Sequence, residues 1–274
     1  MPLLTQEEYS KIKHKTPYVY KIQNKTQFLY YFGEKHSFDP NDAQWTQAKE
    51  FWFDFVKNTE NQKKIAFVEA GRPSVEKTEE KAILEAGGTG LIIFLASQLN
   101  IEVYCPEPNR THEMQELERQ FSREEIEYYF FARIVHQWGK IPDPKPNFEE
   151  YITRFLERDK KVSGWDDFDF SFENLKIIHK KLFNTEFDLE DPNFFKDLVT
   201  PVELKTIINK VARASGKKRN EYIIKKICKY WNNGYSIFIE YGASHAVIQE
   251  PLLKEVLIKI LKKESRITLK MTRL

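Results

Sequence analysis

The chain has 274 residues, of which 41% are hydrophobic and 31% charged, and its formal net charge is +2. This composition is typical of a globular protein with a substantial core, built as one large domain or as a domain with an insertion. No run of 18 apolar residues occurs, so we expect no membrane span. We expect a cytoplasmic location, because no signal-peptide pattern opens the sequence and the two cysteines follow no disulfide or zinc spacing.

Short runs of aromatic and β-branched residues predict the strands of a sheet. The first two runs are 18–23 and 27–32, and the third, 64–69, is almost wholly apolar, as expected of a strand covered on both faces. Further runs lie at 101–104 and 235–241. Helical patterns separate most of these runs, so the predicted fold class is α/β, with a mostly parallel central sheet flanked by helices.

Apolar residues at three-and-four spacing predict the helices. They indicate one helix that ends at residue 58 and others over 75–85, 91–99, 122–138, 201–214, 220–231 and 251–263. Residues 87–90, Gly-Gly-Thr-Gly, are interpreted as a connection between two of these helices. Within a single domain of residues 1–274, the mostly helical region 110–200 is predicted to be an insertion or lid that covers the C-terminal edge of the sheet. A closing edge strand is expected over 266–272.

The same short motif follows two of the predicted strands. The run 27–32 leads into Gly33 and His36, and the run 235–241 leads into Gly242 and His245. Glycine permits a sharp turn, so each histidine would be presented just beyond a strand end. Ligands of open α/β sheets bind outside the carboxyl ends of the strands, where both histidines would then lie.

Carboxylates occupy comparable positions at Glu34, Glu69 and Glu107. Unpaired buried carboxylates cost several kcal/mol each, so these groups must pair, bind a cation or face an open cleft. Fold stability alone does not require acids and imidazoles at strand ends. Taken together, they predict a functional site.

These motifs resemble those of the superfamily that contains the erythromycin esterase/ChaN and TraB/GumN/Tiki proteins. The resemblance rests on Gly-Glu-x-His at 33–36, Glu69 and Gly-Ala-x-His at 242–245, and on Arg-Asn at 219–220, which is similar to the Arg-Asn of TraB/GumN-like proteins. It implies an α/β fold whose motif residues gather at one cleft. Ser37-Phe38 departs from the esterase pattern, which has Gly there, and Tiki-like proteins often have Thr in place of Glu34.

The resemblance implies a hydrolase of ester or peptide bonds, because Tiki-type members resemble metal-dependent proteases and erythromycin esterases open a lactone without metal. His36, Glu69 and His245 could supply three ligands to a divalent metal that leaves a position open for water. Without metal, His36 could act as a general base held by a carboxylate such as Glu69, while Arg219 stabilises an oxyanion. The residues leave both schemes open. The expected catalytic residues are His36, Glu69, Arg219 and His245, and we assign substrate binding to Glu34, Arg72, Glu107 and Arg110.

Two other functions are compatible with the same sequence. ChaN-like members bind haem iron, so a binding protein for haem or another small ligand is the alternative to a hydrolase. The basic run 205–229 could attract nucleic acid, but its usual role is a solvated helix face, and the net charge does not favour nucleic acid. The expected partner is a small-molecule or peptide substrate.

Overall fold

The structure is a computed structural model that describes residues 2–69, 71, 73–141, 144–189 and 192–271, without the side chains of 192–193 and 259–271. The chain separates into two compact units, each described by itself. Unit 1 comprises Met1–Glu107 and Asn220–Leu274, and unit 2 comprises Pro108–Arg219.

Unit 1 is built around a mixed, mostly parallel sheet in the strand order β1-β2-β5-β3-β4. The strands are β1 (Tyr18–Gln23), β2 (Phe28–Glu34), β3 (Lys64–Val68), β4 (Glu102–Tyr104) and β5 (Ser236–Gly242). Only the β1–β2 pair is antiparallel among these pairings. The predicted α/β class and the five predicted core strands are confirmed. Parallel register places Glu34 opposite Gly242 and Val68 opposite Glu240, so three strands end at the same edge.

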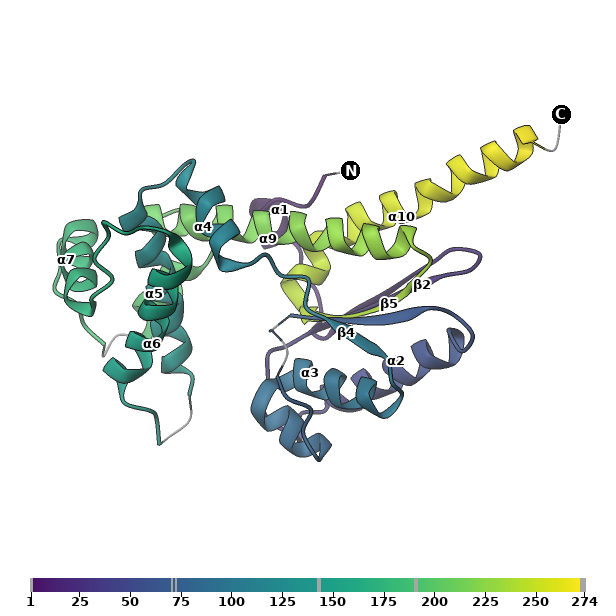
Figure 1. Cartoon of the computed structure of the whole chain (residues 1–274), viewed down its shortest axis with the longest axis horizontal. Helices are drawn as coiled ribbons and strands as arrows, with labels where there is room; N and C mark the ends of the chain where they lie inside the picture. Colours follow the sequence, from purple (N-terminus) through teal and green to yellow (C-terminus); the bar gives the residue numbers. More distant parts are fainter. Residues whose placement is uncertain (1, 70, 72, 142–143, 190–191, 272–274) are drawn as a thin grey trace. The chain divides into compact units, whose positions relative to one another are not determined.

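Helices cover both faces of this sheet (Figure 1). On one face, α2 (Gln44–Asn58) and α3 (Glu79–Gln98) pack on alternate strand residues such as Phe32 and Phe238. On the other face, the intervening residues such as Tyr31 and Ile239 pack against α9 (Ile207–Asn232) and α10 (Ala243–Met271). A short helix, α1 (Gln6–Ser10), contacts α10. Because β2, β3 and β5 are covered on both faces, their sequences are nearly continuous apolar runs, whereas the edge strand β1 exposes Lys21 and Gln23.

The glycine-rich stretch 87–90 lies at a kink inside α3. The helix begins after its N-cap Thr78, and Ala86 and Gly87 leave helical geometry, with Gly87 at φ 57°. Glycine reaches this left-handed conformation without the strain that a Cβ would cause. The two predicted helices 75–85 and 91–99 are therefore the two halves of one kinked element, as the predicted connection implies.

Unit 2 is helical throughout its described secondary structure. Its helices are α4 (Arg110–Glu118), α5 (Arg123–Gly139), α6 (Phe148–Ser163), α7 (Phe172–Phe183) and α8 (Pro192–Val199), followed by residues 207–219 of α9. An aromatic-rich core joins them, with Tyr128, Phe131 and Phe195 among its buried members. The helical character predicted for 110–200 is present, and its action as a cover of the sheet edge stays a prediction. Part of the connector predicted at 142–146 lies outside the described residues.

One helix prediction and one strand prediction differ from the structure. Residues 207–232 form one continuous helix, α9, where two helices were expected over 201–214 and 220–231, because the Gly216 between them costs a helix only about 1 kcal/mol. The edge strand predicted over 266–272 is wrong, since residues up to 271 continue α10 and residue 272 lies outside the described part. A few alternating residues carry a weak strand signal, whereas an established helix gains a hydrogen bond with each added residue. No helix in the described residues is long and apolar enough to cross a membrane.

Candidate functional site

His36 is held by a buried carboxylate beyond the end of β2. Its Nδ1 lies 2.9 Å from Glu34 Oε1, and the side chain of Glu34 is 5% exposed whereas that of His36 is 64% exposed. Because an ionised carboxylate only accepts hydrogen bonds, Nδ1 carries the proton and donates it. The neutral ring then has its lone pair on Nε2. The pair is thus a solvent-accessible imidazole oriented by an acid beneath it.

Glu69 lies between the two motif histidines. Its Oε2 is 3.8 Å from His36 Nε2, and its Oε1 is 3.7 Å from His245 Nε2. The backbone N–H of Gly242 donates to Oε2 over 2.8 Å, which fixes the carboxylate against the end of β5. Both distances to the imidazoles exceed a direct hydrogen bond, and at that separation a water molecule can bridge the groups.

His245 lies in the first turn of α10, directly after β5, and is 9% exposed. Its Nδ1 lies 2.8 Å from Oδ1 of the buried Asn220 in α9. The structure therefore brings together three of the four predicted catalytic residues, His36, Glu69 and His245. Each is fixed by a different element of unit 1.

A second buried acid, Glu240, lies behind Glu34 on β5. Burial raises the pKa of both acids, and Glu240, which is 1% exposed, has a pKa far above the ordinary range. The nearby charges of Glu34 and Glu69 raise the pKa of Glu240 further, so the acids at this point do not all ionise together. Glu34 Oε2 is buried and has no hydrogen-bond partner among the residues that the structure describes. The Thr89 hydroxyl donates a hydrogen bond to Glu240 Oε2 over 3.0 Å.

Two glycines allow these side chains to approach. A Cβ on Gly88 would lie 2.1 Å from Glu34 Oε2 and 2.8 Å from Glu240 Oε1. A Cβ on Gly242 would lie 2.7 Å from His36 Nε2. Contacts this short are excluded for a real Cβ, so α3 requires glycine at position 88 against the buried acids, whereas a Cβ at position 242 would displace the exposed His36 ring.

The other predicted residues are placed as follows. Glu107 follows β4. Burial is the largest cause that raises the pKa of the Tyr241 hydroxyl, and the charges of Glu107, Cys105 and Glu69 raise that pKa further. Arg72 lies outside the described residues. The remaining two belong to unit 2, where Arg219 is the last residue and Arg110 is the first residue of α4.

Arg110 has partners within unit 2. Its guanidinium lies 3.5 Å from Glu113 and 3.5 Å from Asp159, and its Cζ is 3.7 Å from the centroid of the Phe130 ring. Burial lowers the pKa of Arg110, although the adjacent acids oppose this. A substrate-binding role for Arg110 stays a prediction.

Sequence reasoning missed two features of the site. It assigned Glu69 as the carboxylate that holds His36, whereas Glu34 takes that place. It also overlooked Glu240, although an acid within the apolar run of β5 was a usable signal, because a charge there must be paired or neutralised.

The structure does not group these residues as metal ligands. Across the residues that the structure describes, no three His, Cys, Asp or Glu side chains are arranged to hold an ion together. The donor set of His36, Glu69 and His245 does not fit a metal in the geometry shown, so no chemical step below passes through one. Their role as metal ligands stays a prediction.

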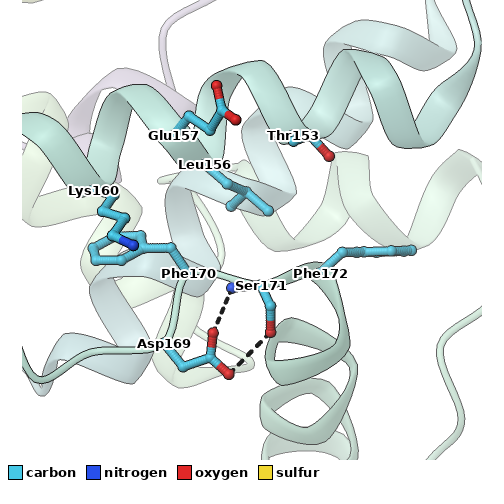
Figure 2. Close-up of a pocket in the computed structure, with 8 residues that line it drawn as sticks. All are labelled: Thr153, Leu156, Glu157, Lys160, Asp169, Phe170, Ser171 and Phe172. Carbon is cyan, nitrogen blue, oxygen red and sulfur yellow. Dashed lines mark hydrogen bonds between the residues drawn. The ribbon is translucent and has the colours of Figure 1, made fainter.

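A pocket lies in unit 2, and none of the predicted site residues lines it. It has a volume of about 390 Å³ and lies between α6 and the start of α7, where Leu156 and Phe170 contribute apolar walls. Asp169 accepts hydrogen bonds from the backbone N–H and the hydroxyl of Ser171 (Figure 2). Asp169 and Ser171 are thus engaged with each other at a turn. We assign the candidate site to the histidines of unit 1, because imidazole and carboxylate groups together can carry acid–base chemistry.

Comparison with protein-family models, with curated proteins and with solved structures gave no match to this chain. The similarity to the erythromycin esterase/ChaN and TraB/GumN/Tiki superfamily stays a prediction.

Proposed function

We propose that the protein is a hydrolase of ester or peptide bonds in which His36 is the general base. The observation that supports this most directly is the pairing of an exposed imidazole with the buried Glu34 through Nδ1. An acid in this position fixes the ring tautomer and stabilises the imidazolium that forms when Nε2 accepts a proton. Buried acids that serve only the fold do not require a solvent-accessible histidine as their partner.

The proposed step is the attack of water on a carbonyl carbon. Nε2 of His36 takes one proton from the water while its oxygen forms the new bond to carbon, and the carbonyl π electrons move to oxygen. When the tetrahedral intermediate collapses, the bond to the alcohol or amine breaks and the proton on His36 passes to that leaving group. Glu69, close to Nε2, stabilises the imidazolium between these two events.

The Nε2 of His245 lies near Oε1 of the same carboxylate, whereas His36 lies near Oε2. A water bound to Glu69 can therefore be held from two directions, which limits the orientations that it adopts. Arg219 remains the predicted stabiliser of the oxyanion. Binding of haem or of another small ligand by this site is the alternative, and no contact in the described residues favours it.

The test is turnover by the 274-residue protein with and without His36. Purified protein is assayed with p-nitrophenyl esters and with fluorogenic peptides, beside His36→Ala and a control, His112→Ala, at an exposed histidine of α4. We expect His36→Ala to lower kcat at least about 100-fold, the usual contribution of a general base. Because His36 is exposed, its loss should change the free energy of unfolding by less than about 1 kcal/mol.

Equal turnover by His36→Ala and the wild-type protein would refute the general-base role. Absence of wild-type turnover on every ester and peptide would refute the hydrolase. A haemin titration of the same samples, followed by absorbance, tests the alternative directly.

A further inference from the structure

A chain of buried hydrogen bonds leads away from His245 through the core of unit 1. The Tyr31 hydroxyl donates to Gln249 Oε1 over 3.1 Å, and Gln249 Nε2 donates to Asn220 Oδ1 over 2.7 Å. The same Oδ1 lies 2.8 Å from His245 Nδ1. Tyr31 and Gln249 are 0% exposed and Asn220 is 2% exposed, so bulk water does not compete for these bonds.

The directions of these bonds are coupled. An amide oxygen only accepts and an amide nitrogen only donates, so Asn220 Oδ1 can serve both neighbours only if each of them donates. Gln249 meets this condition with its NH₂ group, which turns its own oxygen toward Tyr31. His245 meets it only if Nδ1 carries a hydrogen.

We propose that Gln249 is a positioning residue that sets the tautomer of His245. By donating to Asn220, it keeps the amide oxygen of Asn220 turned toward the imidazole. The ring therefore holds its proton on Nδ1, and Nε2, 3.7 Å from Glu69 Oε1, is the acceptor. The catalytic consequence rests on the proposed hydrolase function, whereas the tautomer itself does not.

The chain of hydrogen bonds could also run in the reverse direction, and this alternative provides the test. If both amides were turned over, Asn220 would donate to Gln249 and to Nδ1 of His245. The proton of His245 would then lie on Nε2 and point to Glu69. Because ¹⁵N chemical shifts of imidazole distinguish the two tautomers, nuclear magnetic resonance of labelled protein decides between the two directions without any turnover.

The variant Gln249→Met keeps the length of the side chain but removes the donor. Without that donor Asn220 is free to turn over, so we expect a mixture of tautomers with increased Nε2–H and a fall in kcat of about 10-fold. Adding Asn220→Asp to Gln249→Met should restore the Nδ1–H tautomer, because a carboxylate only accepts. The matched control is Gln62→Met, which removes the acceptor of the Ser236 hydroxyl at the start of β5 and should leave the His245 tautomer unchanged.

An Nε2–H tautomer in the wild-type protein would overturn the inference, and so would a Gln249→Met spectrum with unaltered Nδ1–H. A tautomer change in Gln249→Met without wild-type hydrolysis would support the inference and refute the proposed function. If Gln249→Met fails to fold, Gln249→Leu tests the same point, because it removes the same donor with a different apolar side chain.

Discussion

Glu127 on α5 gives the clearest stability prediction. This side chain is 0% exposed, and neither carboxyl oxygen has a hydrogen-bond partner among the residues that the structure describes. Burial raises its pKa well above the ordinary 4.5, the charge of Asp159 raises it further, and Arg110 and Arg158 oppose the shift. We therefore expect Glu127→Gln, which cannot ionise, to stabilise the protein at neutral pH.

The size of this stabilisation follows from the one proton that the Glu127 carboxyl retains in the folded protein. A carboxyl whose pKa is raised by folding contributes stability that is fully present below pH 4.5 and is lost as pH rises toward the folded-state pKa. Each pH unit between 4.5 and the folded-state pKa costs about 1 kcal/mol. Since the two arginines reduce this cost, we expect Glu127→Gln to gain about 1–3 kcal/mol at pH 7 and almost nothing at pH 4.5.

Urea unfolding followed by tryptophan fluorescence at pH 5, 6, 7 and 8 measures this difference. Amide hydrogen exchange of α5 assigns it to unit 2. The control is Glu157→Gln at an exposed position of α6, which should change stability by less than about 0.5 kcal/mol at every pH. A Glu127→Gln gain that does not grow with pH would show that Glu127 is ionised in the folded protein, and the reasoning from burial would fail.

Three further predictions concern unit 1. Gly242→Ala should reduce turnover by displacing the exposed His36 ring, yet cost less than about 1 kcal/mol in urea unfolding, because that ring can move. Gly88→Ala should lower the free energy of unfolding by about 1–3 kcal/mol in the same assay, because its Cβ meets the buried Glu34, which cannot move. Equal losses for the two variants would contradict this packing argument. Burial first, and then Glu250, raises the pKa of Tyr18 from 10 to about 12, so its stabilising effect should be lost as pH rises through 12. Alkaline unfolding of the wild-type protein and of Tyr18→Phe checks this prediction, because the variant should lack that pH dependence of stability.

The sequence by itself determined the sheet and the position of its two histidines. Aromatic and β-branched runs locate the five strands, most strongly β2, β3 and β5, because a strand covered on both faces must be apolar along its length. Glycines at 33 and 242 mark where two of these strands end, and parallel pairing then brings His36 and His245 to one edge. These conclusions need only local patterns and the general geometry of parallel sheets.

Only the tertiary structure decided which groups touch. Glu34 accepts from the ring of His36, and the kinked α3 brings Gly88 against the same acid, a contact between distant segments. Asn220 and Gln249 likewise meet only after α9 and α10 pack on the same face of the sheet. Sequence periodicity reports which face a residue occupies, whereas a hydrogen bond depends on positions within a few tenths of an ångström, which the packing of whole elements fixes.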